Sequence, residues 1–327
     1  MSMSDAATGA TQPADRMQVR IAVLTYKRPQ DIAAALPRLL TQAESVRTDT
    51  VTADIVVVDN DPDGGAREFV ESFAADHPTT AVIYQNETAA GIAAARNRAL
   101  DTADGIDLLV FIDDDERPSE RWLELLLETY RTHRSAAVVG SVVSEYEVEP
   151  DAWVQSGRFF DRRRLPTGTK LDVAATNNLL LDLHQIRSYG LRFDQQFGLT
   201  GGSDTMFTRT LHKLGGELIW CDEAVVVDVV PAARVTRDWV LRRAFRSGSS
   251  WSATSLKLAE DPKQRTVSRL RLTGRGSVRI AGGAARVAAG AVGRSQGQRA
   301  RGQRTIARGA GMVSGAWGYV YAEYKRS

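Results

Sequence analysis

The sequence predicts an α/β fold, a mostly parallel sheet flanked by helices, with a basic helical extension at the C-terminus. Short apolar runs rich in β-branched residues alternate with segments of helical periodicity over the first half of the chain. This alternation is typical of a parallel sheet with right-handed crossovers. The charge then changes sign, because residues 256–327 hold 15 Lys and Arg against three acids, a net of +12, which leaves −10 on residues 1–255.

Four strands are expected at residues 20–25, 54–58, 81–85 and 107–112, with a helix in each of the three gaps. The first helix begins near Pro29, a favourable first helical residue, and Pro37 is expected to kink it. The other two carry apolar residues at helical spacing, at positions 66–73 and 92–100. Later segments with clear patterns are a helix after Pro118 with Trp122, Leu126 and Tyr130 on its core face, a strand at 136–143, an apolar stretch at 179–183 and a helix at 205–214.

Composition limits the class of protein. With 43% hydrophobic and 25% charged residues, the 327-residue chain matches an ordinary globular protein. Its only cysteine, Cys221, excludes an intramolecular disulfide and fits a reducing compartment. The four histidines are scattered, so any metal is expected to have oxygen ligands. Residues 1–18 are small and polar and are expected to be disordered, without a signal peptide. A cytoplasmic protein is therefore predicted.

Polar residues follow three of the four predicted strands: Thr25 and Tyr26, Asp59 and Asn60, and the triplet Asp113 to Asp115. Ligands of open α/β sheets bind outside the carboxyl ends of the strands, so these side chains are expected at a ligand site. Successive carboxylates point to opposite sides, which lets one bind a hard cation while another contacts the ligand. The alternative is a solvated acidic turn. Neither a Gly-x-Gly-x-x-Gly turn nor a P-loop is present, so a diphosphate would need a metal and side chains.

Between Val19 and about Trp251, the chain resembles a family-2 glycosyltransferase of the GT-A fold. The motifs are specific as a set, although each is weak alone. They are Val23-Leu24-Thr25-Tyr26-Lys27-Arg28-Pro29, Val56-Val57-Val58-Asp59-Asn60, Asn86 followed by Gly91-Ile92-Ala93-Ala94-Ala95-Arg96-Asn97, Phe111-Ile112-Asp113-Asp114-Asp115, Gly201-Gly202-Ser203-Asp204, and the segment from Trp239 to Gly248.

The resemblance implies a GT-A domain at residues 19–250, with a nucleotide-binding half at 19–115 and an acceptor half at 116–250. Residues 251–327 would form a basic extension rich in Gly, Ala and Arg, either a separate module or a loosely docked one. It also implies an inverting transfer of a sugar from a nucleotide-diphosphate donor to an acceptor hydroxyl. The acceptor would be a glycan or a lipid-linked cell-envelope precursor, and the cofactor Mn²⁺ or Mg²⁺.

On the donor side, the resemblance implies that Asp59 bonds the base, and the alternative is that it caps a turn. The residues Thr25, Tyr26 and Arg28 would line the nucleotide pocket, and Asp113 and Asp114 would contact the donor. Asp115 would bind the metal, with Asp113 and Asp228 as further ligands. For Asp228, a lone carboxylate in an apolar run, metal is one of several partners that could satisfy it. Arg96 would support the diphosphate or the acidic loop, or form a plain salt bridge.

On the acceptor side, Asp204 would be the general base, with Gly202 letting the backbone approach the donor sugar. The alternative is that Asp204 caps the following helix. The basic segment containing Arg242, Arg243 and Arg246 would meet the leaving diphosphate through bidentate contacts, with at most two of the three facing the site.

Two other functions stay open at this point. A sugar-nucleotide nucleotidylyltransferase shares the fold and the metal, although its usual glycine-rich loop after the first strand is absent here. A non-catalytic sugar-nucleotide-binding or scaffold protein is the second. For the basic region 256–327 we expect an anionic membrane surface at the inner face of the membrane, with docking on the protein's own acidic core as the alternative. Binding to nucleic acid is not expected.

Overall fold

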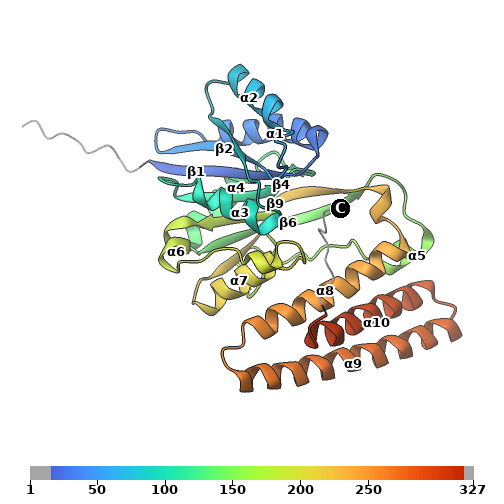
Figure 1. Cartoon of the computed structure of the whole chain (residues 1–327). Helices are drawn as coiled ribbons and strands as arrows, with labels where there is room; N and C mark the ends of the chain where they lie inside the picture. The colour runs from blue at the N-terminus through green and yellow to red at the C-terminus, as the bar shows by residue number, and fades with distance from the viewer. Residues whose placement is uncertain (1–15, 320–327) are drawn as a thin grey trace, which may run out of the picture.

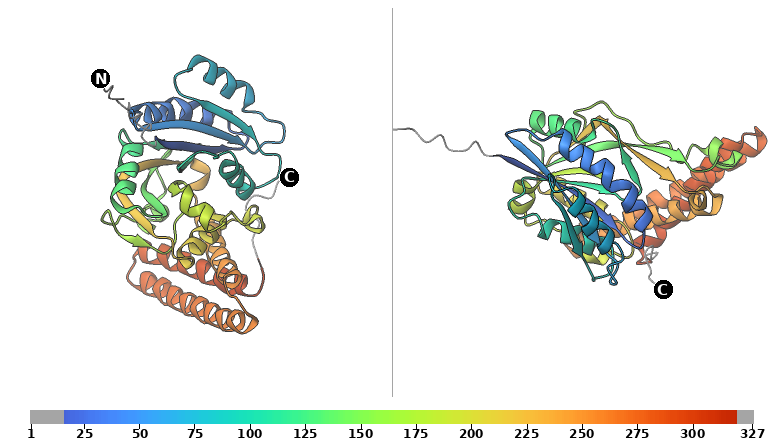
Figure 2. Two further views of the ribbon diagram at one scale, coloured as in Figure 1. Left: turned by 90° about the vertical axis from the view of Figure 1, so that its left-hand side faces the viewer. Right: turned by 90° about the horizontal axis from the view of Figure 1, so that it is seen from above.

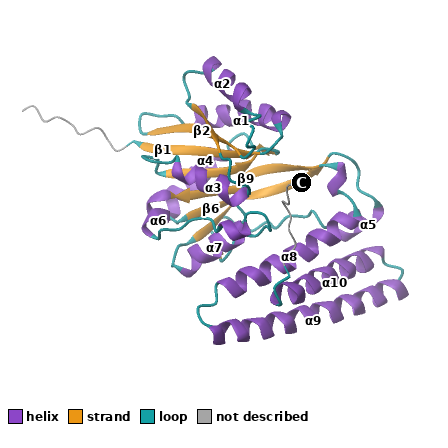
Figure 3. Cartoon of the chain, in the orientation of Figure 1, coloured by secondary structure: helices purple, strands orange, loops and turns teal. Residues whose placement is uncertain are grey.

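The computed structural model describes residues 16–319 and confirms the α/β fold (Figures 1 and 3). Residues 1–15, most of the segment predicted to be disordered, lie outside the described part, and the first strand already begins at Met17. The strands are β1 Met17–Thr25, β2 Val51–Asp59, β3 Val82–Asn86, β4 Leu108–Asp113, β5 Glu116–Pro118, β6 Ala137–Tyr146, β7 Lys170–Leu171, β8 Asn178–Asp182 and β9 Leu218–Val230. The α-helices are α1 Pro29–Ser45, α2 Arg67–Asp76, α3 Ile92–Asp101, α4 Trp122–His133, α5 Ala152–Gly157, α6 Leu183–Ser188, α7 Ser203–Lys213, α8 Arg237–Lys257, α9 Pro262–Val292 and α10 Gln296–Ala316, and short 3₁₀ turns occupy Gln195–Phe197 and Ala232–Arg234.

The described strands form a single sheet in the order β3-β2-β1-β4-β8-β6-β9-β5, with β7 pairing beside β9. Its N-terminal half, β3 to β4, is parallel throughout, as the alternation predicts. The register pairs Thr25 with Asp59 and Leu24 with Asp113, so the polar strand ends meet at one edge. In the C-terminal half, β8 is antiparallel to both of its neighbours and only β6 and β9 run parallel.

Helices cover both faces of the sheet. On one face, apolar helix residues such as Leu36 of α1, Val70 of α2 and Trp122 of α4 pack against every second residue of the strands. On the other face, helix residues such as Ala95 of α3 and Phe207 of α7 pack, with those of α6, against the strand residues in between. The chain continues as one helix through Pro37, and Pro29 stands at its first turn as expected. The result is a three-layer domain whose strand ends are left open for a site.

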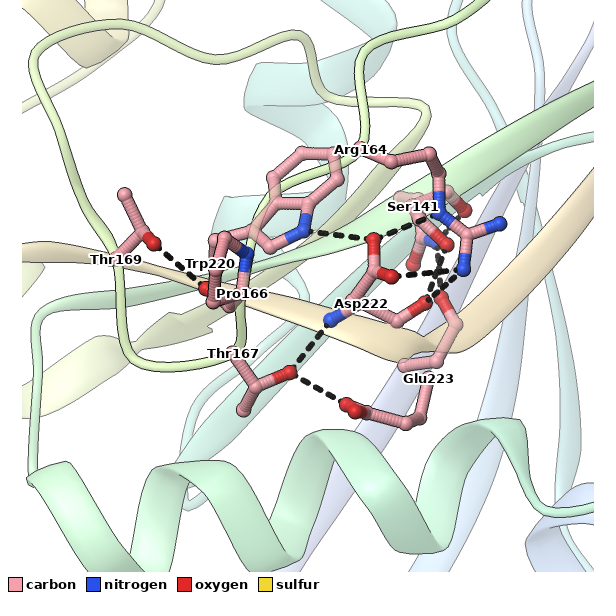
Figure 4. Close-up of polar contacts among 10 residues, drawn as sticks. Ser141, Arg164, Pro166, Thr167, Thr169, Trp220, Asp222 and Glu223 are labelled. Atoms are coloured by element: carbon pink, nitrogen blue, oxygen red, sulfur yellow. Dashed lines mark hydrogen bonds and ion pairs between the residues drawn. The ribbon is translucent and has the colours of Figure 1, made fainter.

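A bulge in β9 fixes the irregular segment at residues 158–170. The pairing of β6 with β9 shifts from Gly140 opposite Cys221 to Ser141 opposite Val225, so residues 222–224 fall outside the ladder. Arg164 donates to both carboxylate oxygens of Asp222, at 2.7 and 2.8 Å, and lowers the pKa of Asp222 (Figure 4). The same network ties Thr167 to Glu223. It therefore anchors the segment that also carries Arg162.

The basic extension forms a layer of long helices, in which α9 and α10 stack on α8, away from α1 and α2 (Figures 1 and 2). Asp261 with Pro262 begins α9, and Ser295 caps α10. Backbones touch where glycines face each other: a Cβ on Gly248 would lie 2.1 Å from the carbonyl oxygen of Arg308. One on Gly311 would lie 1.9 Å from that of Phe245. At these positions α8 and α10 are in direct backbone contact.

Candidate active site

The turn after β4 is bound to the turn after β1 by hydrogen bonds to Asp114. Its two carboxylate oxygens accept from Thr25 Oγ1 at 2.8 Å and from Arg28 Nη1 at 3.0 Å. The same nitrogen of Arg28 donates to Asp115 at 3.0 Å, and Arg234 lies 3.8 Å from Asp115. Burial raises the pKa of Asp114 to about 7, against the lowering effects of Arg28 and Thr25. Asp114 thus holds the two turns together, and its predicted donor contact stays a prediction.

Asp113 lies at the centre of a group of like charges. Burial, followed by the carboxylates of Asp115, Asp228 and Asp204, raises the pKa of Asp113 to about 6, while Arg96 lowers it. The neighbouring Glu116 is buried, and burial raises its pKa well above the usual range. Glu116 bonds the backbone NH of Asp113 at 3.2 Å, so it orients the acidic turn. In addition, Asn177 donates to Glu116 at 2.6 Å.

Asp228, predicted as a metal ligand, forms an ion pair with an arginine. It is paired with Arg162, which also donates to Ser144 at 3.1 Å. In the sheet, Asp228 lies opposite Glu116 of β5 and Ser144 of β6. An ion pair with hydrogen bonds around it is sufficient to satisfy a carboxylate in an apolar strand. Its part in a metal site therefore stays a prediction without support from these contacts.

The carboxylate of Asp59 turns into the loop that precedes α2. It accepts hydrogen bonds from the backbone NH of Asp61 at 2.9 Å and of Ala66 at 3.0 Å. A third comes from Tyr84 Oη at 3.0 Å. With a side chain only 1% exposed, Asp59 fits the alternative interpretation of a turn cap. By contrast, Tyr26 on the neighbouring turn is 38% exposed.

Arg96 holds the turn before α7 in place. Arg96 Nη1 donates to Ser203 Oγ at 2.7 Å, and its guanidinium lies over the ring of Phe193. Gly202 occupies the N-cap position with φ of +97°, a conformation that favours glycine, so Asp204 is not the cap. Asp204 stands in the first turn of α7, where its Oδ1 accepts from the NH of Thr205 at 2.7 Å.

A cavity of about 440 Å³ opens beside this turn, a size typical of small-ligand sites. Asp204 and Gly202 line it, together with Arg243 and Arg246 of α8. Arg242, the third arginine of the segment, is exposed and pairs with Asp238 one turn earlier. Arg308 of α10 also lines the cavity, so the extension contributes to the site. Sequence reasoning missed Arg308, Arg162 and Glu116; of these, only Glu116 had a local signal, its position after the Asp triplet.

The acidic turn fits a divalent cation with few protein ligands. Among residues 16–319, no three His, Cys, Asp or Glu side chains surround a metal position. Asp113 and Asp115 nevertheless offer the carboxylate oxygens that Mg²⁺ and Mn²⁺ accept. Magnesium binds through one or two carboxylates plus substrate phosphates, so a third protein ligand is not required. The repulsion that Asp113 feels from Asp115, Asp204 and Asp228 would also be relieved by a cation.

Comparison with known proteins decides the family. The model of the family described as glycosyl transferase family 2 matches residues 20–190. This chain belongs to glycosyltransferase family 2. The succinoglycan biosynthesis protein ExoM of Rhizobium meliloti is 35% identical over 240 residues, which cover 73% of this chain and 75% of that protein. The protein is therefore a nucleotide-sugar glycosyltransferase, which favours glycosyl transfer over the nucleotidylyltransferase alternative.

Solved structures of glycosyltransferases share the fold. The mannosyltransferase PcManGT from Pyrobaculum calidifontis, in complex with GDP-Man and Mn²⁺, has a TM-score of 0.62 at 20% identity, over 94% of this chain and 89% of that one. S. aureus TarS 1-349 in complex with UDP has a TM-score of 0.51 at 14% identity, over 89% and 90% of the two chains. Both similarities cover a larger part of this chain than the match to the family model does.

Proposed function

We propose that this glycosyltransferase inverts the anomeric centre of its donor, with Asp204 as general base. The acceptor hydroxyl would lose its proton to the Asp204 carboxylate while its oxygen attacks the anomeric carbon. The bond from that carbon to the diphosphate breaks in the same step. The observation that carries this proposal is that Asp204 lines a cavity of about 440 Å³ together with Arg243 and Arg246. General base catalysis of this kind typically contributes about 10²–10⁴-fold.

Donor binding is proposed at the strand ends. The turn at residues 25–28, which Asp114 holds in place, would line the nucleotide pocket with Tyr26 at its surface. Asp113 and Asp115 would hold Mg²⁺ or Mn²⁺, which when bound neutralises charge on the leaving diphosphate. Arg243 and Arg246, which line the cavity with Asp204, would bind the diphosphate oxygens. Arg96 would keep the Ser203-Asp204 turn in position through its bond to Ser203.

For the acceptor we propose a glycan carried on a lipid, presented at an anionic membrane surface. No helix within residues 16–319 is long and apolar enough to span a membrane. The outer face of α9, however, exposes Leu270 at 63% and Val278 at 72%. The 3.6-residue helical repeat places Arg271 and Arg275 beside these apolar side chains. An apolar stripe flanked by arginines is typical of helices that lie in a membrane interface.

Membrane binding can be tested without disturbing the fold. Deletion of residues 270–327 would uncover the α8 surface that α10 packs on, so point variants are preferable. We expect wild-type protein to float with vesicles of 30% phosphatidylserine at low salt. The double variant Leu270→Asp/Val278→Asp should stay in the unbound fraction. The matched control is Asp76→Asn, an exposed change on α2. Equal flotation of all three proteins would refute the membrane proposal.

The transfer itself is tested with a panel of UDP-, GDP- and dTDP-sugars and Mn²⁺, by following nucleotide-diphosphate release. Asp115→Asn should abolish the release seen with the active donor. Asp204→Asn should lower kcat about 10²–10⁴-fold and still bind the donor. Asp76→Asn should match wild type. An Asp204→Asn enzyme with full kcat would show that another group accepts the proton.

A further inference from the structure

Two cavities meet at the helical layer and share an arginine-rich wall. The cavity beside Asp204 and a second one of about 230 Å³ have Arg243, Ser247 and Arg308 in common. Arg304 lines the second cavity, together with Arg162 and Arg163. Arg162 has an acidic partner in Asp228. The two linings together hold six arginines against two carboxylates, Asp204 and Asp161, so positive charge predominates beside the candidate base.

The extension supplies two of these arginines, Arg304 and Arg308, which have no role in the mechanism proposed above. Arg304 and Arg308 are four residues apart on α10, so they lie on one face of the helix. Burial lowers the pKa of both. For Arg308, the positive charges of Arg279 and Arg304 lower the pKa further. The Nε of Arg308 is buried without a hydrogen-bond partner among the described residues.

Such an arrangement costs stability when no anion is bound. Like charges at i and i+4 destabilise a helix, and a buried, unpaired guanidinium NH loses its bond to water. The close contact between Gly248 and the backbone of Arg308 places this residue directly against α8. A bound polyanion would offset both costs, and bidentate guanidinium bonds favour phosphate groups.

We propose that Arg304 and Arg308 form a binding site for a phosphate or diphosphate group carried by the acceptor. The proposal rests on the glycosyl transfer proposed above and names the chemical class of its acceptor, a glycan whose carrier is attached through phosphate. The site lies next to the cavity of Asp204, so the acceptor's anion would be held beyond the hydroxyl that reacts. The C-terminal extension would then be the part of the enzyme that selects the acceptor.

Titration calorimetry of the full chain with inorganic pyrophosphate, in buffer containing Mg²⁺, tests this site directly. We expect binding that weakens about 10- to 100-fold in Arg308→Gln and in Arg304→Gln, the loss expected for a charge-assisted hydrogen bond. Arg308→Lys should recover part of the affinity. Arg265→Gln, which removes an exposed charge from α9, is the matched control and should bind as wild type. Unchanged affinity in both glutamine variants would overturn the proposal.

The nucleotide-sugar donor also carries a diphosphate, and this group has the same chemistry as the proposed acceptor phosphate. The titration is therefore repeated with saturating UDP and with saturating GDP. Pyrophosphate that still binds in the presence of the nucleotide supports an acceptor site. Complete displacement by either nucleotide would assign the arginines to the leaving group and overturn the proposal. The binding assay needs no turnover, so its failure is separate from failure of the donor panel. Far-UV circular dichroism of each variant checks that α10 remains folded.

Discussion

Replacing Gly311 by alanine tests the packing that brings α10 to the active site. An added Cβ would lie 1.9 Å from the carbonyl oxygen of Phe245, about 1.5 Å inside an ordinary contact. Both partners are backbone of long helices, so neither can rotate away and the helices have to separate. Overpacking of this kind costs about 1–3 kcal/mol, while alanine in place of glycine in a helix contributes about 1 kcal/mol in favour of folding. We expect a net loss of up to about 2 kcal/mol.

The matched control is Gly274→Ala, the same change in α9. A Cβ at Gly274 meets nothing within 4 Å, so only the helix propensity acts and the variant should gain about 0.5–1 kcal/mol. Urea unfolding, followed by far-UV circular dichroism, measures the free energy of unfolding of both variants. The slopes of free energy against urea concentration are compared to check that each variant unfolds in a single transition. The two substitutions should move the midpoint in opposite directions. A Gly311→Ala protein as stable as Gly274→Ala would refute the close contact of α8 and α10.

Three further outcomes are expected. Asn178→Ala removes the hydrogen-bond acceptor of Trp122 Nε1, at 2.8 Å, and the donor to the carbonyls of Ser141 and Ala224, both at 2.9 Å. It should lower the free energy of unfolding by about 2–4 kcal/mol in the same urea assay. A decrease below about 0.5 kcal/mol would contradict the buried network. Cys221 is 1% exposed and burial raises the pKa of its thiol, so a thiol reagent such as DTNB should label it only on unfolding, and rapid labelling of the native protein would be inconsistent with this burial. EDTA should abolish nucleotide-diphosphate release, with recovery on adding Mn²⁺, whereas full activity in EDTA would exclude a required metal at Asp113 and Asp115.

Local patterns in the sequence predicted most of the sheet and its flanking helices. The strands β1 to β4 and the helices α1, α3 and α4 fall within a few residues of the expected ranges, because alternation and helical spacing depend on neighbours in the chain. The strand ends were predicted for the same reason: an apolar run that stops at Asp113 marks the end of a strand. The pairing directions of β8 were not predicted, since its antiparallel partners lie far away in sequence.

The functions of individual side chains depended more strongly on the tertiary structure. Asp59 and Asp114 carry the same carboxylate as Asp113, yet hydrogen bonds turn Asp59 into its own loop and Asp114 toward Thr25. The ion pair of Asp228 with Arg162 spans 66 positions in the sequence, a contact with no local signal. The extension, rich in Gly, Ala and Arg, was predicted to be helical, but only the packed structure shows that glycines such as Gly311 are contact points between helix backbones.

The sequence by itself determined the α/β class, the edge of the sheet that carries the site, and the family, because these follow from periodicity and from motifs of neighbouring residues. Only the tertiary structure decided that Asp204 and Arg308 line one cavity and that Arg304 lines a second cavity beside it. The physical reason is that a side chain's role depends on the partners that satisfy its charge and hydrogen bonds. Those partners come from segments that are brought together only when the core closes.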